Sequence, residues 1–276
     1  YTISYNLNGG TVSPENPTSY TIEDTFTLNN PTKTGYTFAG WTGTGLSSPT
    51  TTVSIVKGIA NGTQGGNRTY TANWTVTNYS ISYNLDGGSA TNPASYTVET
   101  TTFILNNPTK TGYIFLGWTG TGLSSATKSV TITKGSTGNR TYTATWEKVI
   151  NLTFESNGGT FICHSDGEES TRFSFEGWTL RDVERLQNEY SYSSTGFYID
   201  DAYDATREHY TFGGFSSSTN GTSDTFKTIS ASYLLNNYDS YTFYAVWIPV
   251  TYTISYNLNG GTVSPENPTS YTIEDT

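Results

Sequence analysis

The stretch YTISYNLNGGTVSPENPTSYTIEDT, residues 1–25, recurs letter for letter at residues 252–276. Twenty-five matches in 25 positions exclude coincidence, and the offset between the two copies is 251 residues. Repetition at a fixed spacing indicates a tandem array rather than one globular domain. We therefore expect the chain to span one long period and the opening of the next copy. An array of this kind favours a scaffold or a binding surface over an enzyme.

A shorter repeat lies inside the long one. Residues 26–48 match residues 103–125 at 20 of 23 positions, and GNRTYTANW at 66–74 returns as GNRTYTATW at 138–146. The opening strand and its NGG turn also recur. We predict three modules and a fragment, at 1–75, 79–147, 150–248 with an insertion near 161–195, and 252–276.

The joints between the predicted modules are only a few residues long and contain no Gly/Ser-rich or Pro-rich tract. We therefore expect a semi-rigid series of modules rather than freely tumbling ones. The first two modules differ in length mainly between Val56 and Asn67, a Gly-rich stretch that predicts a surface loop. The chain contains no methionine, so we expect it to be a segment of a longer protein.

Alternation of apolar and polar residues predicts strands. Ile3, Tyr5 and Leu7 share one face of a period-two pattern. The pattern ends at Asn8-Gly9, a strong turn signal because both residues accept positive φ. The closing segments around Trp74 repeat an alternation of the same kind. The fold class that follows is mainly β, in small modules arranged in tandem.

A helical pattern stands out only in the third module. Leu180, Val183, Leu186 and Tyr190 recur at spacings of three and four residues, with charged residues between them. This periodicity is typical of an amphipathic helix. We therefore predict one short helix in the third module.

The six tryptophans occupy two recurring places, either directly after a glycine or in the closing strand. Aromatic side chains bury about 150–250 Å² each, and modules of this size are close to the limit at which one core suffices. The fixed places therefore predict structural residues rather than ligand contacts. The predicted core positions are Trp41, Trp74, Trp118, Trp146, Trp178 and Trp247.

Three signatures occur in the same order in the first two modules. They are NGG after an alternating strand, P-T-K-T-G-Y-x-F-x-G-W, and a closing T-Y-T-A-x-W. This set resembles the Listeria–Bacteroides repeat, the B-repeat type of internalin-like bacterial surface proteins, over both modules from end to end. The resemblance implies a small β-grasp (ubiquitin-like) fold and a place in surface-exposed stalks, spacers or adhesion segments. The family motif carries no catalytic residues, so we expect no enzymatic activity.

The third module departs from this pattern. It opens with Asn157-Gly158-Gly159, but FYIDDAYDATREHYTFGGF at 197–215 is a degenerate copy of YTIEDTFTLNNPTKTGYTFAGW, with Phe215 in the place of Trp41. The insertion near 161–195 carries its own FSFEGW, the predicted helix and the only cysteine. We expect the register of this module to differ from that of the first two.

The negative charge is concentrated in the third module. Residues 149–250 hold 14 acidic and 5 basic side chains, whereas residues 1–148 hold 6 acidic and 8 basic ones. The sequence lacks the excess of basic residues that nucleic-acid binding requires, which argues against such a function. No apolar run approaches the roughly 20 residues of a membrane span. Richness in Thr, Asn, Gly and Tyr with 13% charged residues favours an extracellular or cell-surface location in a bacterium.

Two clusters in the third module invite a chemical interpretation. Residues 163–166 (Cys-His-Ser-Asp) lie in one short turn, where they cannot form a nucleophilic dyad, and zinc would need ligands beyond His209. We interpret this turn as structural or solvent-exposed. Asp200, Asp201 and Asp204 offer oxygen ligands and are a weak Ca²⁺ candidate. Their spacing is not that of an EF-hand, so we favour a solvated acidic loop and expect no cofactor.

Four tyrosines in or beside the insertion are the candidate contacts for a partner: Tyr190, Tyr192, Tyr198 and Tyr203. The sequence therefore supports two functions. The first is a structural stalk, spacer or fibre-forming unit whose partners are neighbouring repeats of the same array, with self-assembly into a filament as one form. The alternative is an adhesin that binds a host protein or glycan through the acidic third module.

Overall fold

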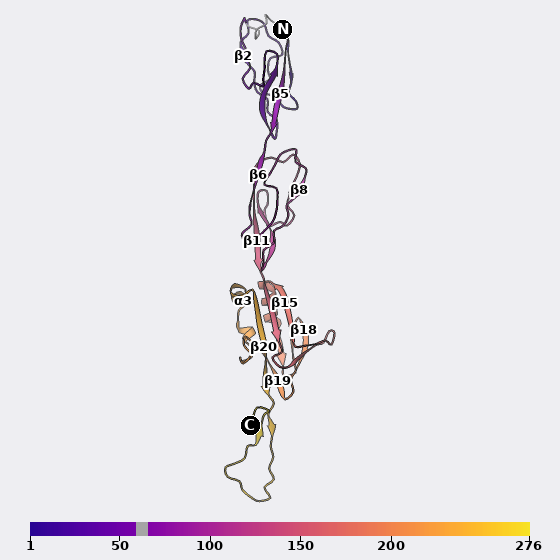
Figure 1. Cartoon of the computed structure of the whole chain (residues 1–276), viewed down its shortest axis with the longest axis vertical. Coiled ribbons are helices and arrows are strands. Elements are labelled where there is room, and N and C mark those ends of the chain that lie inside the picture. The colour runs from indigo at the N-terminus through magenta and orange to yellow at the C-terminus, as the bar shows by residue number, and fades with distance from the viewer. Residues whose placement is uncertain (59–65) are drawn as a thin grey trace. The chain divides into compact units, whose positions relative to one another are not determined.

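The computed structural model describes residues 1–58 and 66–276, and the fold is mainly β (Figure 1). Most of the loop predicted between Val56 and Asn67 lies outside the described residues. The chain divides into two compact units. One comprises Tyr1–Pro108 and Leu116–Thr145, and the other comprises Thr109–Phe115 and Trp146–Thr276.

The first module is built on a three-stranded sheet. Its strands are β1 (Ile3–Asn6), β2 (Phe26–Thr27), β3 (Tyr36–Gly43), β4 (Ser54–Ile55) and β5 (Arg68–Val76). The order in the sheet is β1-β5-β3, with β1 parallel and β3 antiparallel to β5. Strands β2 and β4 pair separately. The opening strand thus lies beside the closing strand, which is the central strand of the sheet.

The second module repeats this arrangement. Its strands are β6 (Tyr79–Asn84), β7 (Ser95–Tyr96), β8 (Phe103–Ile104), β9 (Tyr113–Gly120), β10 (Thr131–Ile132) and β11 (Arg140–Lys148). The order is β7-β6-β11-β9, with β6 parallel to β11, while β8 pairs with β10. This order around a central parallel pair is the β-grasp sheet that the resemblance implies. Neither of the first two modules contains a helix within its described residues.

The two cores use the same positions. The fully enclosed apolar side chains of the first module are Ile3, Tyr20, Leu28, Trp41, Val53, Ile55, Tyr70 and Ala72. Their counterparts in the second module are also buried: Ile81, Tyr96, Leu105, Trp118, Val130, Ile132, Tyr142 and Ala144. Burial of equivalent apolar residues in each module provides a separate hydrophobic driving force for each.

The NGG turn and the closing tryptophan form one structural element. Trp74 Nε1 donates a hydrogen bond to the Leu7 carbonyl at 3.1 Å, and a Cβ on Gly10 would lie 2.4 Å from Trp74 Cζ2. In the third module, a Cβ on Gly159 would lie 2.3 Å from Trp247 Cζ2. The second glycine of the turn is therefore required because the indole ring covers it. Trp74, Trp146, Trp178 and Trp247 are only half-buried, whereas Trp41 and Trp118 are fully buried.

The third module contains two sheets. Its strands are β12 (Ile150–Glu155), β13 (Thr160–Cys163), β14 (Glu169–Ser170), β15 (Arg172–Trp178), β16 (Ser191–Ser193), β17 (Gly196–Ile199), β18 (Asp201–Thr206), β19 (Tyr210–Ser216) and β20 (Ser240–Pro249). The first sheet, β15-β12-β20-β19, keeps the parallel central pair as β12 and β20. The second sheet has the order β14-β13-β18-β17-β16 and comes largely from the predicted insertion.

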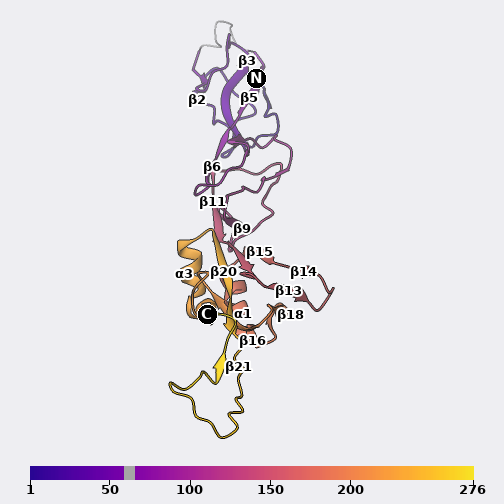
Figure 2. The ribbon, with the colours of Figure 1, turned by 60° about the horizontal axis from the view of Figure 1, so that its bottom comes forward.

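The third module has three helices where the sequence predicts one. The predicted helix is present as α1 (Leu180–Glu189), with Val183 and Leu186 buried. The two further helices are α2 (Thr225–Thr228) and α3 (Ala231–Asn237). Both are too short to show two full turns of periodicity, which is why the pattern does not reveal them. Figures 1 and 2 show α3 on one side of β20 and β18 on the other.

The register of the third module differs from that of the first two. Residues 197–201 lie in the second sheet and do not take the edge position of Ser95–Tyr96. That position, beside the opening strand, belongs to β15. Its FSFEGW alternation allows a full seven-residue strand. Downstream the prediction holds, because Phe215 pairs with Ala245 as Trp41 pairs with Ala72.

The final 25 residues show how one sequence behaves in two environments. Strands β21 (Tyr252–Thr253) and β22 (Ser270–Tyr271) form a short antiparallel pair. Tyr20 is 5% exposed in the first module, whereas the identical Tyr271 is 47% exposed. In the first module, the rest of the repeat covers Tyr20 as part of one buried cluster with Trp41 and Tyr70.

Helix α1 begins at a capping box that makes the stability of the third module depend on pH. Asp182 Oδ2 accepts hydrogen bonds from Thr179 Oγ1 at 2.6 Å and from the Thr179 amide at 3.0 Å. These bonds lower the pKa of Asp182. Because the pKa is lower in the folded state, the stabilisation is present above the unfolded value near 3.9 and is lost as the pH falls through the folded value.

We expect Asp182→Asn to reduce the free energy of unfolding of the third module by about 0.5–1 kcal/mol at pH 7, the usual range for loss of a helix cap. Urea unfolding of variant and parent should converge once the pH lies below the folded pKa of Asp182, where both side chains are neutral. Glu184→Gln, an exposed change on the same helix, is the control. A difference between Asp182→Asn and the parent that persists at acid pH would contradict this explanation.

Candidate interaction surfaces

The candidate partner tyrosines of the third module have different environments. Tyr190 is only 2% exposed and packs against Phe215 and Phe226, with ring centroids 6.0 and 5.5 Å away. Burial raises its pKa. The prediction that Tyr190 contacts a partner is therefore wrong. It follows α1 directly, and the helical spacing that identified the helix also marked this residue as part of the buried face.

Tyr203 is also part of the interior of its sheet. Its ring lies nearly parallel to those of Phe173 and Phe197, with centroid distances of 4.9 and 5.0 Å and interplanar angles of 8° and 10°. Burial raises its pKa to about 12. Tyr192 and Tyr198 remain at the surface, 38% and 42% exposed.

These surface tyrosines line a shallow hollow on the second sheet. Tyr198 shares one face of that sheet with His164 and Asp204, whereas the strand register places Tyr192 and Tyr203 on the other face. His164 Nε2 lies 3.1 Å from Asp204 Oδ1. Exposed aromatic rings beside a hydrogen-bonding pair can contact a sugar ring or a peptide side chain through an apolar face and a polar edge. This hollow is the part of the predicted partner surface that the structure leaves accessible.

The three aspartates of the calcium candidate do not converge. Asp200 Oδ1 lies 3.0 Å from Arg185 Nη2, and Asp204 pairs with His164. Asp201 and Asp204 belong to one strand, whose side chains alternate between faces. Across the described residues, no group of three or more His, Cys, Asp or Glu side chains is placed to hold a metal ion.

Cys163 and His164 contact different carboxylates. Cys163 Sγ donates to Asp201 Oδ2 at 3.2 Å and lies 3.1 Å from Ser165 Oγ. Hydrogen bonds from Ser165, the Ala202 amide and Cys163 lower the pKa of Asp201. His164 faces Asp204 instead. The thiol and the imidazole therefore do not act on one another, and these contacts favour the structural interpretation of the turn.

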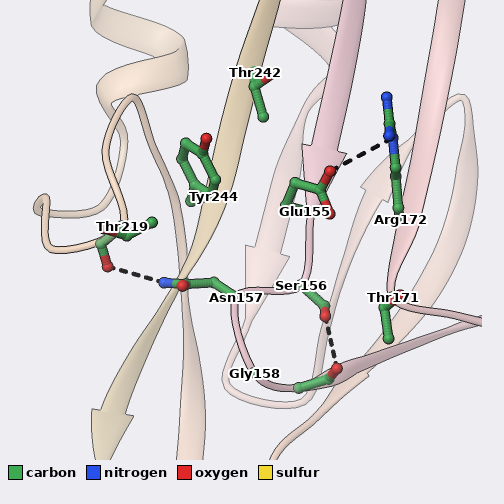
Figure 3. Close-up of a pocket in the computed structure, with 10 residues that line it drawn as sticks. Glu155, Ser156, Asn157, Gly158, Thr171, Arg172, Thr219, Thr242 and Tyr244 are labelled. Carbon is green, nitrogen blue, oxygen red and sulfur yellow. Dashed lines mark hydrogen bonds and ion pairs between the residues drawn. The ribbon is translucent and has the colours of Figure 1, made fainter.

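A second hollow lies at the NGG turn of the third module (Figure 3). Its polar groups are already engaged with the protein. Asn157 Nδ2 donates to the carbonyls of Thr219 and Ala245, each at 2.9 Å, and Arg172 pairs with Glu155 at 3.5 Å. We interpret the hollow as the outer side of a well-bonded turn, because its hydrogen-bonding groups serve the fold.

The segments that connect successive modules share a recurring backbone hydrogen bond. After each closing strand, one backbone amide donates to a carbonyl just before the strand that lies beside the closing strand in the sheet. The bonds run from Thr77 to Gly35 at 2.9 Å, from Val149 to Gly112 at 3.0 Å, and from Val250 to His209 at 2.9 Å. Each bond lies within one compact unit. The residues that connect successive modules are thus held by main-chain hydrogen bonds, although the side chains at these positions differ.

Comparison with known proteins identifies the first two modules. Residues 1–58 and 79–145 match the model of the Listeria-Bacteroides repeat domain. A protein of Evansella cellulosilytica, whose name describes it as a Gly-rich membrane protein, is 28% identical over 191 residues. That match covers 64% of this chain and 21% of the relative, so the chain spans about a fifth of the relative's length. No solved structure matches. None of the helices in the described residues is long and apolar enough to cross a membrane.

Proposed function

We propose that this chain is a stalk or spacer segment of a bacterial extracellular or cell-surface protein. The proposal starts from its membership of the Listeria–Bacteroides repeat family through its first two modules. In this role the array positions another part of a longer protein at a distance from the cell. The name of the Evansella cellulosilytica relative, a Gly-rich membrane protein, supports an association with the cell envelope. The third module and the repeat that follows extend the same series.

The observation that carries this proposal is the backbone hydrogen bond that recurs at all three joints. A spacer must keep its length, and length depends on how far each joint bends. Joints of a few residues, each tied by a main-chain bond to the module before it, limit that bending. Separate cores in successive modules provide the second requirement, because a stalk built from them lengthens with each added module.

Small-angle X-ray scattering of the chain tests the proposal. A single globule of 276 residues would have a radius of gyration of about 19 Å. We expect a value at least about twice as large, with a distance distribution that has the long tail of an extended particle. A radius of gyration near that of a single globule would reject the stalk.

A second candidate function is adhesion through the third module. The hollow beside Tyr198 favours it, because this tyrosine remains exposed on a face of the second sheet that the repeat does not require. Removing the whole insertion would also remove β15 and α1, which support the core, so a point substitution is the better test. If the module is an adhesin, Tyr198→Ala weakens binding of the chain to host glycans or proteins. The control Tyr233→Ala, at another exposed tyrosine, leaves that binding unchanged.

A further inference from the structure

Two of the three joints share a contact between side chains of consecutive modules. Tyr36 Oη donates to Glu99 Oε1 at 2.6 Å, and Tyr210 Oη donates to Glu274 Oε1 at 3.1 Å. Tyr36 and Tyr210 are equivalent, because each is the first residue of the strand that pairs antiparallel with the closing strand of its module. A hydrogen bond to a carboxylate is stronger than one between neutral groups. The contact therefore adds a specific attraction to the backbone bond at the joint.

The donor tyrosines are held in place by a cation. Lys33 Nζ lies 4.2 Å from the centroid of the Tyr36 ring, and the Arg207 guanidinium lies 4.0 Å from that of Tyr210. A cation over the ring face fixes the direction of the hydroxyl and supplies positive charge near the incoming carboxylate. The hydrogen bond with Glu99 raises the pKa of Tyr36, as expected for a hydroxyl that donates to an anion.

The acceptor side has its own signature, an apolar residue followed by glutamate. The pairs at equivalent positions are Ile22–Glu23, Val98–Glu99 and Ile273–Glu274. At the first joint the apolar member is tightly packed, since a Cβ on Gly35 would lie 2.0 Å from Val98 Cγ1. At the last joint the apolar member, Ile273, stays 50% exposed, so the contact that the two joints share is the carboxylate on the tyrosine hydroxyl.

In the first module, the equivalent pair Ile22–Glu23 has no tyrosine hydroxyl bonded to it within the described residues of this chain. Ile22 is 56% exposed, and the Glu23 side chain is 64% exposed and pairs with Lys57. The identical sequence at the other end of the chain carries Glu274, which accepts the Tyr210 hydroxyl. The same sequence therefore occurs in two states. In the first copy its glutamate pairs with Lys57, and in the second copy its glutamate accepts a hydrogen bond from the third module.

We infer that Ile22 and Glu23 form a docking face for the Tyr210 end of a third module that belongs to another copy of this repeat period. The occupant is fixed by the repeat, because Ile273 and Glu274, the same residues one period later, meet that end in this chain. On docking, the Glu23 carboxylate gives up its ion pair with Lys57 and accepts a hydrogen bond from the Tyr210 hydroxyl. The inference refines the proposed stalk and rests on it for the identity of the partner.

The second joint provides a natural control. Lys110 Nζ lies 4.1 Å from the Tyr113 ring, as at the other joints. Within the described residues, however, no hydrogen bond of the Tyr113 hydroxyl to the third module is observed, and Lys148 Nζ pairs with Asp239 Oδ1 at 3.3 Å instead. The third module lacks the Y-T-x-E opening, and its joint uses another pair of charges.

The test uses a chain of two consecutive periods, residues 1–251 followed by 1–276. Every joint then keeps its natural context, because Thr251 already precedes a copy of Tyr1 in this chain. Spin labels on the third module of the first period and on the next module report the distribution of distances across the new joint. Tyr210→Phe in the first period removes only the hydroxyl. We expect it to raise the population of undocked conformers about two- to fivefold, the range typical of a solvent-exposed ionic contact.

Two controls make the result specific. Tyr113→Phe should leave the new joint unchanged, and Lys57→Ala in the second period should not weaken docking, because Lys57 competes for Glu23. Unchanged melting temperatures of the modules show that the substitutions act on the joint. Identical distance distributions with and without the Tyr210 hydroxyl would overturn the docking face. If the same chain still has the scattering of an extended particle, the stalk proposal stands even when the docking face is rejected. The two proposals can therefore fail separately.

Discussion

Trp41→Ala should unfold the first module and leave the third module folded. The Trp41 side chain is fully buried, contacts Phe38 edge-on at 5.4 Å, and donates to Asn30 Oδ1 at 3.1 Å. Truncating a buried tryptophan to alanine costs about 3–5 kcal/mol. A module of about 75 residues has roughly 4–11 kcal/mol of stability in total. The substitution therefore removes a large part of what holds this module together.

Hydrogen exchange followed by mass spectrometry measures the effect by segment. In Trp41→Ala, we expect protection to fall most in residues 1–58 and to stay at the parent level in residues 150–248. Trp118→Ala is the matched variant, and it should reverse the pattern between the first two modules because Trp118 holds the same buried place. Loss of protection throughout the chain in either variant would mean a single cooperative core, contrary to the proposed array.

Gly120→Ala should destabilise the second module far more than Gly122→Ala. Both glycines have positive φ, +132° and +76°, so each substitution carries backbone strain. They differ in the space available to a new methyl group. A Cβ on Gly120 would lie 2.1 Å from the Thr141 carbonyl oxygen of the neighbouring strand, whereas Gly122 has no atom within 4 Å. Only the first substitution forces two strands of the sheet apart.

We expect Gly120→Ala to cost at least about 3 kcal/mol and Gly122→Ala about 1–2 kcal/mol, the usual penalty of the left-handed region alone. The midpoint of urea unfolding of the second module separates the two. Gly43→Ala should reproduce the larger effect in the first module, because its Cβ would lie 2.0 Å from the Thr69 carbonyl oxygen. Equal losses for the two glycines of the second module would show that the strand contact is unimportant.

The repeated parts of the fold follow closely from local sequence. Alternation around Tyr5 predicts the opening strand, and the NGG turn and closing strand follow in each module. Helix α1 is also correctly predicted, because its apolar residues keep helical spacing over ten residues. These features depend on periodicity and turn chemistry, which a single sequence displays directly.

The third module exposes the limits of the same reasoning. The second sheet joins β13 to β18 across about 40 residues of chain, and no local pattern records such a pairing. The degenerate resemblance of residues 197–215 to the repeat left the register open, and the edge of the first sheet beside β12 belongs to β15. Tyr190 and Tyr203 were misjudged because aromatic residues outside the repeat register were expected at the surface, whereas both pack within the third module.

The role of the residues at the joints could not be predicted from the sequence alone. The apolar–glutamate pair at Ile22–Glu23 is visible as letters, but its role depends on the tyrosine that it meets in the neighbouring module. A signal was available in retrospect, since Y-T-x-E occurs in the segments that bond to Tyr36 and Tyr210 and is missing from the third module. Recurrence of an exposed charged residue at a fixed place in a repeat therefore points to a joint.

Pulling a single chain by its two ends tests the central claim most directly, because it counts the independent folded units in series. The account predicts three separate unfolding events. The modules at 1–75 and 79–147 should each release about 23–27 nm of chain, and the module at 150–248 about 33–36 nm, at roughly 3.3–3.6 Å per residue. A single event that releases nearly the whole chain at once would contradict the array and would show one shared core instead.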